Sequence, residues 1–315
     1  MSAAASGGAD VLRASRALLP TDDLRHRPAP GARMRDSVFY QTVLPEERLA
    51  VQVYLFVTGT GAAGYNVAVW GDAAPTVREF GGGRVAEAMD LDDFTVGGLT
   101  VRHRDPLRTA DVVVRTDRIE LDLTFTALHE AFSFRDAPDG LPSWFAEDRI
   151  EQTGAVRGHV RADDHAFELG PIGHRDHSWG LRDWRAPQHW KWLVAYTPSG
   201  RAVNGWTWIA AGRWGFAGYV LRDGRPVPVS RIEDDTTYGA GYEQRRLHAV
   251  LHDVEGGTTT LDLDVFGVLH LPDERTGTTV LEGGCVARID GERGAGQFEV
   301  EWPTDYFAHL RGDDA

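Results

Sequence analysis

Apolar and polar residues alternate with a period of two along much of this chain. The segments 119–125, 261–265 and 298–302 each place an apolar residue at every second position, with acidic or hydroxyl residues between them. Successive side chains of a β-strand point to opposite faces, so this pattern is typical of half-buried antiparallel strands. The chain is therefore predicted to be rich in such strands.

Turn signals separate these segments, and helical patterns are scarce. The residues 11–19 are expected to form a short helix and 305–310 a terminal turn, while residues 1–32, rich in Ala, Gly and Pro, are expected to form a loosely held arm. Glycine-containing turns are predicted at 81–83, 198–200, 223–224 and 256–257.

Many short strands in a chain of 315 residues predict a sandwich or barrel system. This length favours two domains over one. A weak internal repeat agrees, because Val69, Asp72 and Pro75 recur at one constant offset as Val220, Asp223 and Pro226. The expected fold is all-β, with two antiparallel β domains at 33–150 and 151–315 and few short helices.

A glycine motif at 59–64 matches the pattern G-x-G-x-x-G of dinucleotide sites. Such a site needs a helix directly after the glycines, to receive the pyrophosphate at its N-terminus. The residues 65–70 read as a strand instead, so the motif is interpreted as a hairpin loop. No cofactor is expected.

The amino-acid composition of the chain narrows the classes of molecule that it is expected to bind. The formal net charge of −14 argues against nucleic acid and anionic membranes, which bind basic surfaces. No apolar run reaches the length of a membrane span, and residues 1–10 lack the apolar core of a signal peptide. The single cysteine, Cys285, is expected to be buried and fits a reducing compartment, so a cytoplasmic protein is predicted. Exposed sheet edges can pair with a second copy of the chain, so a homodimer stays an open alternative.

The densest candidate chemistry lies at 173–184, in the sequence GHRDHSWGLRDW, which holds two Asp, two Arg, two His and two Trp. Loops on rigid β scaffolds often carry function, so this stretch is expected to line an active site. A structural alternative remains open. Asp176 could accept backbone N–H bonds in a turn, the arginines could pair with carboxylates, and the tryptophans could fill the core, making the stretch a latch.

A metal site is a further alternative. His174 and His177 lie three residues apart, with Asp176 between them and His189 downstream, and such residues bind zinc or iron. On a strand, however, a spacing of three places the two imidazoles on opposite faces, and no H-E-x-x-H helix is present. No metal is expected at these residues.

The motif resembles a known superfamily. Glu151-Gln152, Gly158 and the segment 173–184 are similar to a bacterial family of uncharacterised domains, over most of the chain beyond residue 35. That family is related to the hydroxyneurosporene synthase (carotenoid 1,2-hydratase) and AttH-like superfamily. Its Asp-His-x-Trp-Gly signature is matched here by Asp176, His177, Trp179 and Gly180.

The resemblance implies two lipocalin-like β-barrel domains with a ligand cavity between or within them. Members include hydratases of isoprenoid double bonds and, in fungi, cofactor-free cyclases of polyketide products. This chain departs from the pattern in carrying Arg175 and the extension Arg182-Asp183-Trp184, so the substrate and reaction do not transfer.

The residue types suggest roles for this stretch. Asp176 in an apolar pocket would hold a proton near neutral pH, and His177 would relay protons or activate water. Arg182 with Asp183 would orient the loop or a substrate carbonyl. The indole faces would stabilise a developing cation, although core packing explains them equally well. The candidate substrate-binding residues are Arg175, Trp179, Trp184, Trp190, Trp192, Trp206 and Trp208.

Three hypotheses for function follow. The first is a cofactor-independent lyase or isomerase, of hydratase, dehydratase or cyclase type, acting on a hydrophobic isoprenoid, polyketide or polycyclic substrate. The second is a lipocalin-like carrier of a hydrophobic small molecule, without catalysis. The third is a metal-dependent enzyme that uses the histidine cluster. The first is favoured, because a carrier has no need of an acid, a base and two arginines in one segment.

Overall fold

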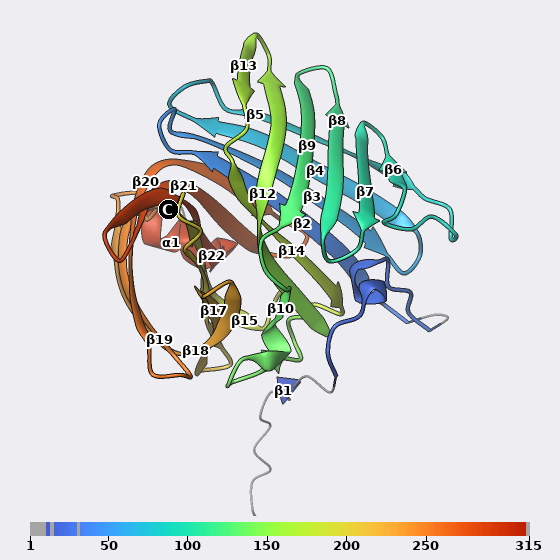
Figure 1. Cartoon of the computed structure of the whole chain (residues 1–315). Coiled ribbons are helices and arrows are strands. Elements are labelled where there is room, and N and C mark those ends of the chain that lie inside the picture. Colours follow the sequence, from blue (N-terminus) through green and yellow to red (C-terminus); the bar gives the residue numbers. More distant parts are fainter. Residues whose placement is uncertain (1–10, 13–15, 30–31, 313–315) are drawn as a thin grey trace, which may run out of the picture.

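The chain folds into two antiparallel sheets that pack side by side. The computed structural model describes residues 11–12, 16–29 and 32–312. Figure 1 shows the blue-to-green strands of the first sheet beside the yellow-to-red strands of the second. This arrangement confirms the prediction of an all-β chain with two barrel-like domains.

The first sheet has the strand order β5-β4-β3-β2-β14-β12-β9-β8-β7-β6, and its two end strands approach each other, so that it curls into an open barrel. Its strands are β2 (Arg35–Leu44), β3 (Leu49–Thr58), β4 (Ala62–Gly71), β5 (Val77–Arg84), β6 (Phe94–Val96), β7 (Leu99–Asp105), β8 (Thr109–Arg115), β9 (Ile119–Ala127), β12 (Asp148–Ala162) and β14 (Ile172–Gly180). The short strands β10 (Phe132–Ser133) and β13 (His165–Glu168) also pair with β12, while β1 (Val11–Leu12) pairs with β11 (Leu141–Pro142).

The second sheet is a closed barrel of eight strands in sequence order. They are β15 (Pro187–Tyr196), β16 (Ala202–Ala210), β17 (Arg213–Arg222), β18 (Arg225–Tyr238), β19 (Gln244–Asp253), β20 (Thr258–Asp273), β21 (Thr278–Ile289) and β22 (Glu292–Pro303). The 3-10 turns η1 (Pro20–Asp23) and η2 (Phe134–Asp136) and the helix α1 (Thr304–Arg311) complete the described elements.

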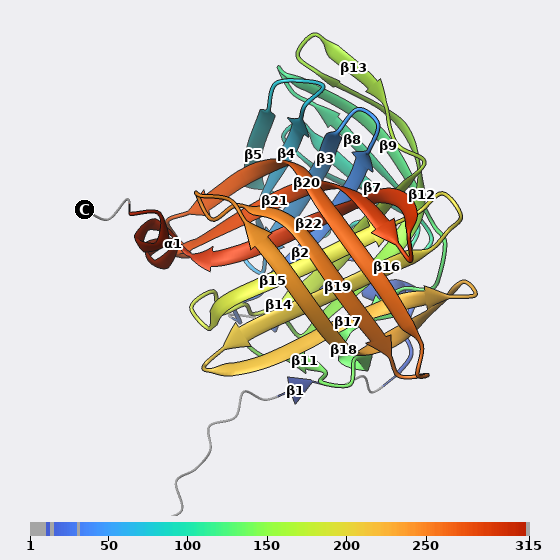
Figure 2. The same ribbon diagram turned by 90° about the vertical axis from the view of Figure 1, so that its left-hand side faces the viewer.

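Each barrel has its own apolar interior. Val53, Leu55 and Leu121 are buried inside the first, and Leu263 and Phe298 inside the second. A third cluster lies between the barrels, where aromatic side chains from the outer faces of β2, β15 and β16 meet. Figure 2 shows the barrel strands crossing beside the first sheet. The fold therefore has two separate apolar cores and an aromatic interface between them.

Several sequence predictions are confirmed in detail. The alternating segments form parts of β9, β20 and β22, and residues 305–310 lie in α1. The glycine motif at 59–64 joins β3 to β4 as a hairpin, with no helix after it. Cys285 is buried in the interior of the second barrel.

Other predictions differ from the structure. Residues 81–83 lie inside β5 and not in a turn, because they pair with β4. The helix expected over 11–19 is wrong where the structure describes it, since Val11–Leu12 form β1 and residues 16–19 are not helical. Residues 1–10 and 13–15, which belong to the expected arm, lie outside the described residues.

The chain passes from the first sheet to the second at a point after residue 150. β12 and β14 pair with each other and with β9 and β2, so both belong to the first sheet. The division falls between Gly180 and Pro187. The signature at 173–180 is therefore a central strand of the first sheet, and only 181–186 form a loop.

Side chains on the face of β14 that points into the first barrel bind the N-terminal segment. Arg175 Nη1 donates to Asp23 Oδ1 at 2.8 Å, and the backbone N–H of Leu107 donates to Asp23 Oδ2 at 2.6 Å. His177 lies between Asp23 and Asp36, with its Nε2 2.6 Å from Asp36 Oδ1. This network, called the latch below, packs residues 19–27 against the sheet, in contrast to the expected loose arm.

The latch is an ionic network inside the protein. Burial raises the pKa of Asp36, but the neighbouring His177 outweighs burial and brings it to about 2. Burial lowers the pKa of His177, whereas Asp36 and Asp23 raise it to about 9. Trp179 completes the latch by stacking on His26 with ring centroids 3.8 Å apart. His177 is therefore a buried imidazolium at neutral pH.

We expect Asp23→Ala to destabilise the protein by about 3–5 kcal/mol, because it leaves Arg175 and His177 buried without a shared counter-charge. Equilibrium urea unfolding measures this change. Asp93→Ala is the matched control, since it breaks an exposed ion pair with Arg102 and should cost about 1 kcal/mol or less. Equal losses in both variants would contradict the latch.

The latch also predicts a pH dependence. The pKa of His177 is raised on folding, so its contribution is complete below about pH 6.5 and is lost as pH rises through about 9. The difference in unfolding free energy between the wild type and His177→Gln should shrink by roughly 3 kcal/mol across this window. A difference that stays constant from pH 6 to 10 would show that His177 is neutral in the folded protein.

Candidate active site

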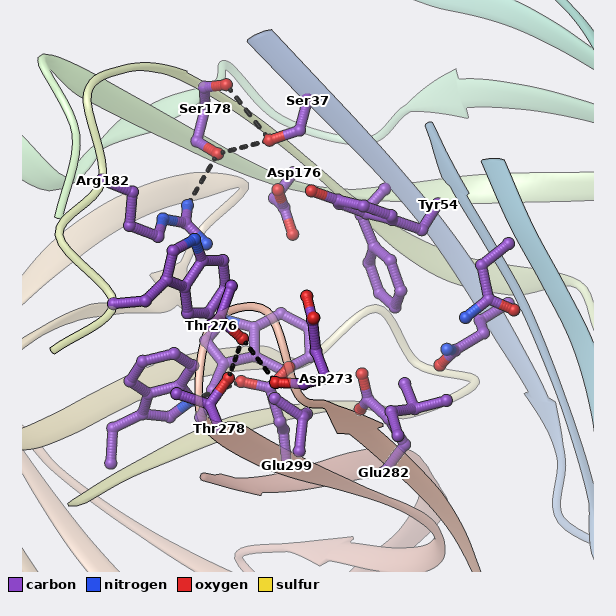
Figure 3. Close-up of a pocket in the computed structure, with 18 of the residues that line it drawn as sticks. Ser37, Tyr54, Asp176, Ser178, Arg182, Asp273, Thr276, Thr278, Glu282 and Glu299 are labelled. Carbon is purple, nitrogen blue, oxygen red and sulfur yellow. Dashed lines mark hydrogen bonds between the residues drawn. The ribbon is translucent and has the colours of Figure 1, made fainter. Parts of the chain in front are cut away.

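A cavity of about 290 Å³ lies between the outer faces of the two barrels. Strands β2, β3 and β14 form one wall, and β15, β16, β21 and β22 form the other. The end of β20, with Asp273, and the turn that follows it, with Thr276, border it as well. Figure 3 shows Asp176 pointing into this space from one wall and Glu282 and Glu299 lying on the opposite side.

The alternation of β14 decides which signature residues reach the cavity. Asp176 and Ser178 line it, whereas the odd-numbered Arg175 and His177 point into the first barrel. His174 shares the face of Asp176 but is fully buried beside Glu151 and Trp192. His174 and His177 thus lie on opposite faces of the strand, as the spacing predicts.

Asp176 is held from the neighbouring strand. Glu151 stands opposite it in the β12–β14 register, and Arg149 bridges the two carboxylates. The Arg149 Nη2 donates to Asp176 Oδ2 at 2.8 Å, and its Nε donates to Glu151 Oε1 at 2.6 Å. Burial raises the pKa of Asp176 to about 7, despite the opposing effect of Arg149. Asp176 can therefore exchange a proton near neutral pH.

Glu151 behaves differently, although it is equally buried. It accepts hydrogen bonds from Arg149, from His174 Nε2 at 2.6 Å and from Trp192 Nε1 at 3.0 Å. Burial raises its pKa, but Arg149 and His174 outweigh burial and lower it below the ordinary value. Two adjacent carboxyl groups thus have opposite shifts, one ionised and one protonatable.

A second carboxyl pair faces the cavity from the barrel. Burial and the adjacent Glu299 raise the pKa of Glu282, and burial also raises the pKa of Glu299. Trp190 Nε1 donates to Glu299 at 2.5 Å, and Gln297 Nε2 donates to Glu282 at 2.6 Å. The two side chains hydrogen-bond each other, which requires that they share a proton.

Aromatic side chains form a large part of the remaining lining, beside polar residues such as Gln52, Asn66 and Arg78. Trp184, Trp190, Trp192 and Trp206 line the cavity together with Phe39 and Phe145. Trp192 contacts Phe39 edge-on, and Trp206 lies 4.5 Å from Phe145 between ring centroids. Such a surface binds apolar molecules and stabilises developing positive charge.

The family is evident from the sequence. A sequence model for a domain of unknown function, DUF7064, matches residues 19–304. The chain belongs to this family. No curated protein matches the DUF7064 chain in sequence.

Solved structures with the same fold extend the comparison. A putative AttH from Nitrosomonas europaea is 13% identical with a TM-score of 0.66, over 92% of this chain and 98% of that one. CghA with Sch210972 is 13% identical with a TM-score of 0.58, over 86% and 89%. Kievitone hydratase from Nectria haematococca is 12% identical with a TM-score of 0.56, over 84% and 87%. The chain thus shares its fold with these three proteins, which is the fold that the signature resemblance implies.

The sequence-predicted site residues of the DUF7064 chain fall into two groups. Those that line the cavity are Asp176, Arg182, Trp184, Trp190, Trp192 and Trp206. The others lie away from it: Arg175, His177 and Trp179 belong to the latch, Asp183 is exposed, and Trp208 packs on Trp144 and Trp206. Trp144 and Trp208 therefore extend the aromatic interface beyond the cavity.

Sequence reasoning missed Arg149, Glu282 and Glu299. Glu299 alternates with Phe298 and Val300, and this pattern is typical of a strand whose polar face meets solvent. In the structure the first sheet covers that face of β22, so Glu299 meets the cavity instead. A usable signal was the density of acidic residues next to aromatic residues in the sequence of β22. In the structure this strand lies beside β15, which carries Trp190 and Trp192.

The histidines considered for a metal do not come together. His189 Nδ1 donates to the backbone oxygen of Glu301, and His174 and His177 lie on opposite faces of β14. Within the described part of the chain, one other group, His26, Asp36 and His177, brings ligand atoms within 4.8 Å of one another. Its Asp36–His177 contact is the hydrogen bond of the latch.

In the described residues, no helix is long and apolar enough to cross a membrane.

We expect one carboxyl group of the protein to titrate near pH 7 and to disappear in Asp176→Asn. Infrared spectra follow the protonated carboxyl band as pH rises from about 5 to about 9, and the wild-type minus variant difference isolates Asp176. Glu301→Gln is the control, since it should remove a separate component near pH 8. An unchanged band near pH 7 in Asp176→Asn would refute the assignment.

Proposed function

We propose that the cavity between the barrels is the active site of a cofactor-independent lyase or isomerase, of hydratase, dehydratase or cyclase type. Its substrate is an apolar small molecule, of isoprenoid, polyketide or polycyclic character. One observation carries the proposal: Asp176, a carboxyl group with a pKa of about 7, faces a cavity walled by tryptophans. An acid poised at neutral pH in an apolar site is suited to proton transfer.

The residues supply the parts of an acid–base reaction. Protonated Asp176 donates to an alkene carbon or a carbonyl oxygen of the bound substrate. The faces of Trp190, Trp192 and Trp206 stabilise the cation that forms. In a hydration, water then adds to the cation and its proton passes to the Glu282–Glu299 pair on the opposite wall. The glutamate pair then releases that proton to solvent, and solvent returns one to Asp176, so both groups are restored and the net change is addition of one water molecule.

Arg149 and Glu151 are positioning residues in this proposal. Glu151 anchors the Arg149 guanidinium, which in turn fixes one oxygen of Asp176. Among the described residues, the other oxygen of Asp176 has no hydrogen-bond partner. It is therefore the atom available to a substrate.

The fold supports a lyase or isomerase, but it does not determine whether the reaction is a hydration, a dehydration or a cyclisation. One structure with this fold is named a hydratase of kievitone, and another holds Sch210972. Kievitone is accordingly a reasonable first probe, together with linear isoprenoids and aromatic polyketides. Hydration in ¹⁸O-water labels the product, and isomerisation or cyclisation in D₂O introduces deuterium without adding water.

We expect Asp176→Asn to lower kcat for any substrate found by about 100- to 10,000-fold, because the amide has no acidic proton to donate. Labelled-product mass spectrometry measures the rate. Asp183→Asn is the matched control, since Asp183 is exposed and away from the cavity, and it should keep wild-type activity. If Asp176→Asn retains the wild-type rate, Asp176 is not the acid. Binding without turnover in the wild type would favour the carrier.

A further inference from the structure

Two arginines at one end of the cavity have no acidic partner. Arg35, at the start of β2, and Arg182, in the loop after β14, both line the cavity, and among the described residues neither forms an ion pair. The other arginines of the signature region differ, because Arg149 is bound by Asp176 and Glu151, and Arg175 by Asp23. Arg78, on β5, also lines the cavity without an ion pair, but it donates to the side-chain oxygen of Asn66. At the end of the cavity formed by the start of β2 and the loop after β14, the uncompensated positive charge is that of Arg35 and Arg182.

Arg182 is held rigidly, and its charge is not neutralised. Its Nε donates to the backbone oxygen of Phe145 at 3.1 Å, and its Nη2 donates to Ser178 Oγ at 3.1 Å. The guanidinium lies 4.0 Å from the ring centroid of Phe145 and 4.8 Å from that of Trp184. Burial lowers its pKa to about 10, and the nearby Arg149 and Arg35 act in the same direction. Repulsion of this kind is relieved when an anion binds.

Arg35 offers free donors beside it. Its guanidinium lies over the rings of Phe56 and Tyr54, at 4.2 and 5.4 Å from their centroids. Its Nε is buried and has no hydrogen-bond partner. A buried, unpartnered N–H costs free energy, so a ligand oxygen that accepts from it is favoured.

Two hydroxyl groups lie at the same end. Ser37 and Ser178 face each other across the β2–β14 pair, with their Oγ atoms 3.1 Å apart. These serines, Arg35 and Arg182 also line a small recess of about 10 Å³ that adjoins the cavity. Figure 3 shows Ser37, Ser178 and Arg182 gathered at one end, with Asp176 between them and the carboxyl pair of the barrel.

We propose that Arg35 and Arg182 bind the carboxylate of an amphipathic substrate whose apolar body lies against the tryptophans. This inference rests on the proposed function only in taking the cavity as the substrate site. Guanidinium groups match a carboxylate through paired N–H donors, and desolvated surroundings strengthen the contact. With the acid group held at Arg35 and Arg182, the carbon skeleton extends past Asp176 towards Glu299. The substrate class is thus a hydrophobic carboxylic acid.

Calorimetry with a matched pair of probes tests the proposal. Naphthaleneacetate and naphthaleneacetamide have the same aromatic body and nearly the same shape, and only the first is charged. We expect the wild type to bind the acid roughly tenfold or more tightly than the amide, with the preference falling as salt is raised. Arg182→Gln and Arg35→Gln should each lose most of this preference, while their affinity for the amide stays within about twofold.

Three further variants make the outcome decisive. Arg182→Lys keeps the charge and should keep part of the preference, which separates loss of charge from loss of folding. Arg185→Gln removes an exposed arginine outside the cavity and should bind both probes like the wild type. Asp176→Asn should still prefer the acid, so failure of the proposed chemistry leaves this result intact. Equal affinity of the wild type for acid and amide, or a preference that survives in both glutamine variants, would overturn the proposal.

Discussion

The pairing of β14 with β2 on one edge and β12 on the other is the constraint on which the rest of the structure depends. Because all three strands are antiparallel and in fixed register, each side chain of the signature is assigned to one of two environments. One face meets the interior of the first barrel and fastens residues 19–27. The other meets the second barrel and lines the cavity. A one-residue slip would exchange the latch with the site.

This division accommodates both interpretations of the signature, one as a structural latch and the other as the lining of a cavity. The latch uses Arg175, His177 and Trp179, and the cavity uses Asp176 and Ser178. A strand with buried charge on both faces is costly, since each charge needs a partner to offset its desolvation. The structure supplies partners almost everywhere: Asp23 and Asp36 inside the barrel, and Arg149 and Glu151 beside the cavity. Asp176 has a raised pKa because burial outweighs the effect of Arg149, and the neighbouring Glu151 raises it further.

Local pattern is enough to predict the strands, the hairpin at 59–64 and the all-β class, because a period of two depends only on backbone geometry. The spacing of two also places Trp190 with Trp192, and Trp206 with Trp208, on one face of their strands. It cannot predict Asp23 or Glu299 as partners, since each meets its neighbours only after long-range packing. Glu299 in particular reads as a solvent-facing residue until the first sheet covers β22. The sheets divide after Gly180 for the same reason: β12 and β14 pair with strands that lie far back in the chain.

The cavity is lined by the outer faces of two barrels whose interiors are filled independently. A lining residue such as Trp190 belongs to the aromatic cluster between the barrels and not to the apolar interior of either one. Changes in the shape of the binding surface are uncoupled from the integrity of each core. A chain with this architecture can vary the residues between its barrels without repacking either interior, although such a change alters how one barrel packs against the other.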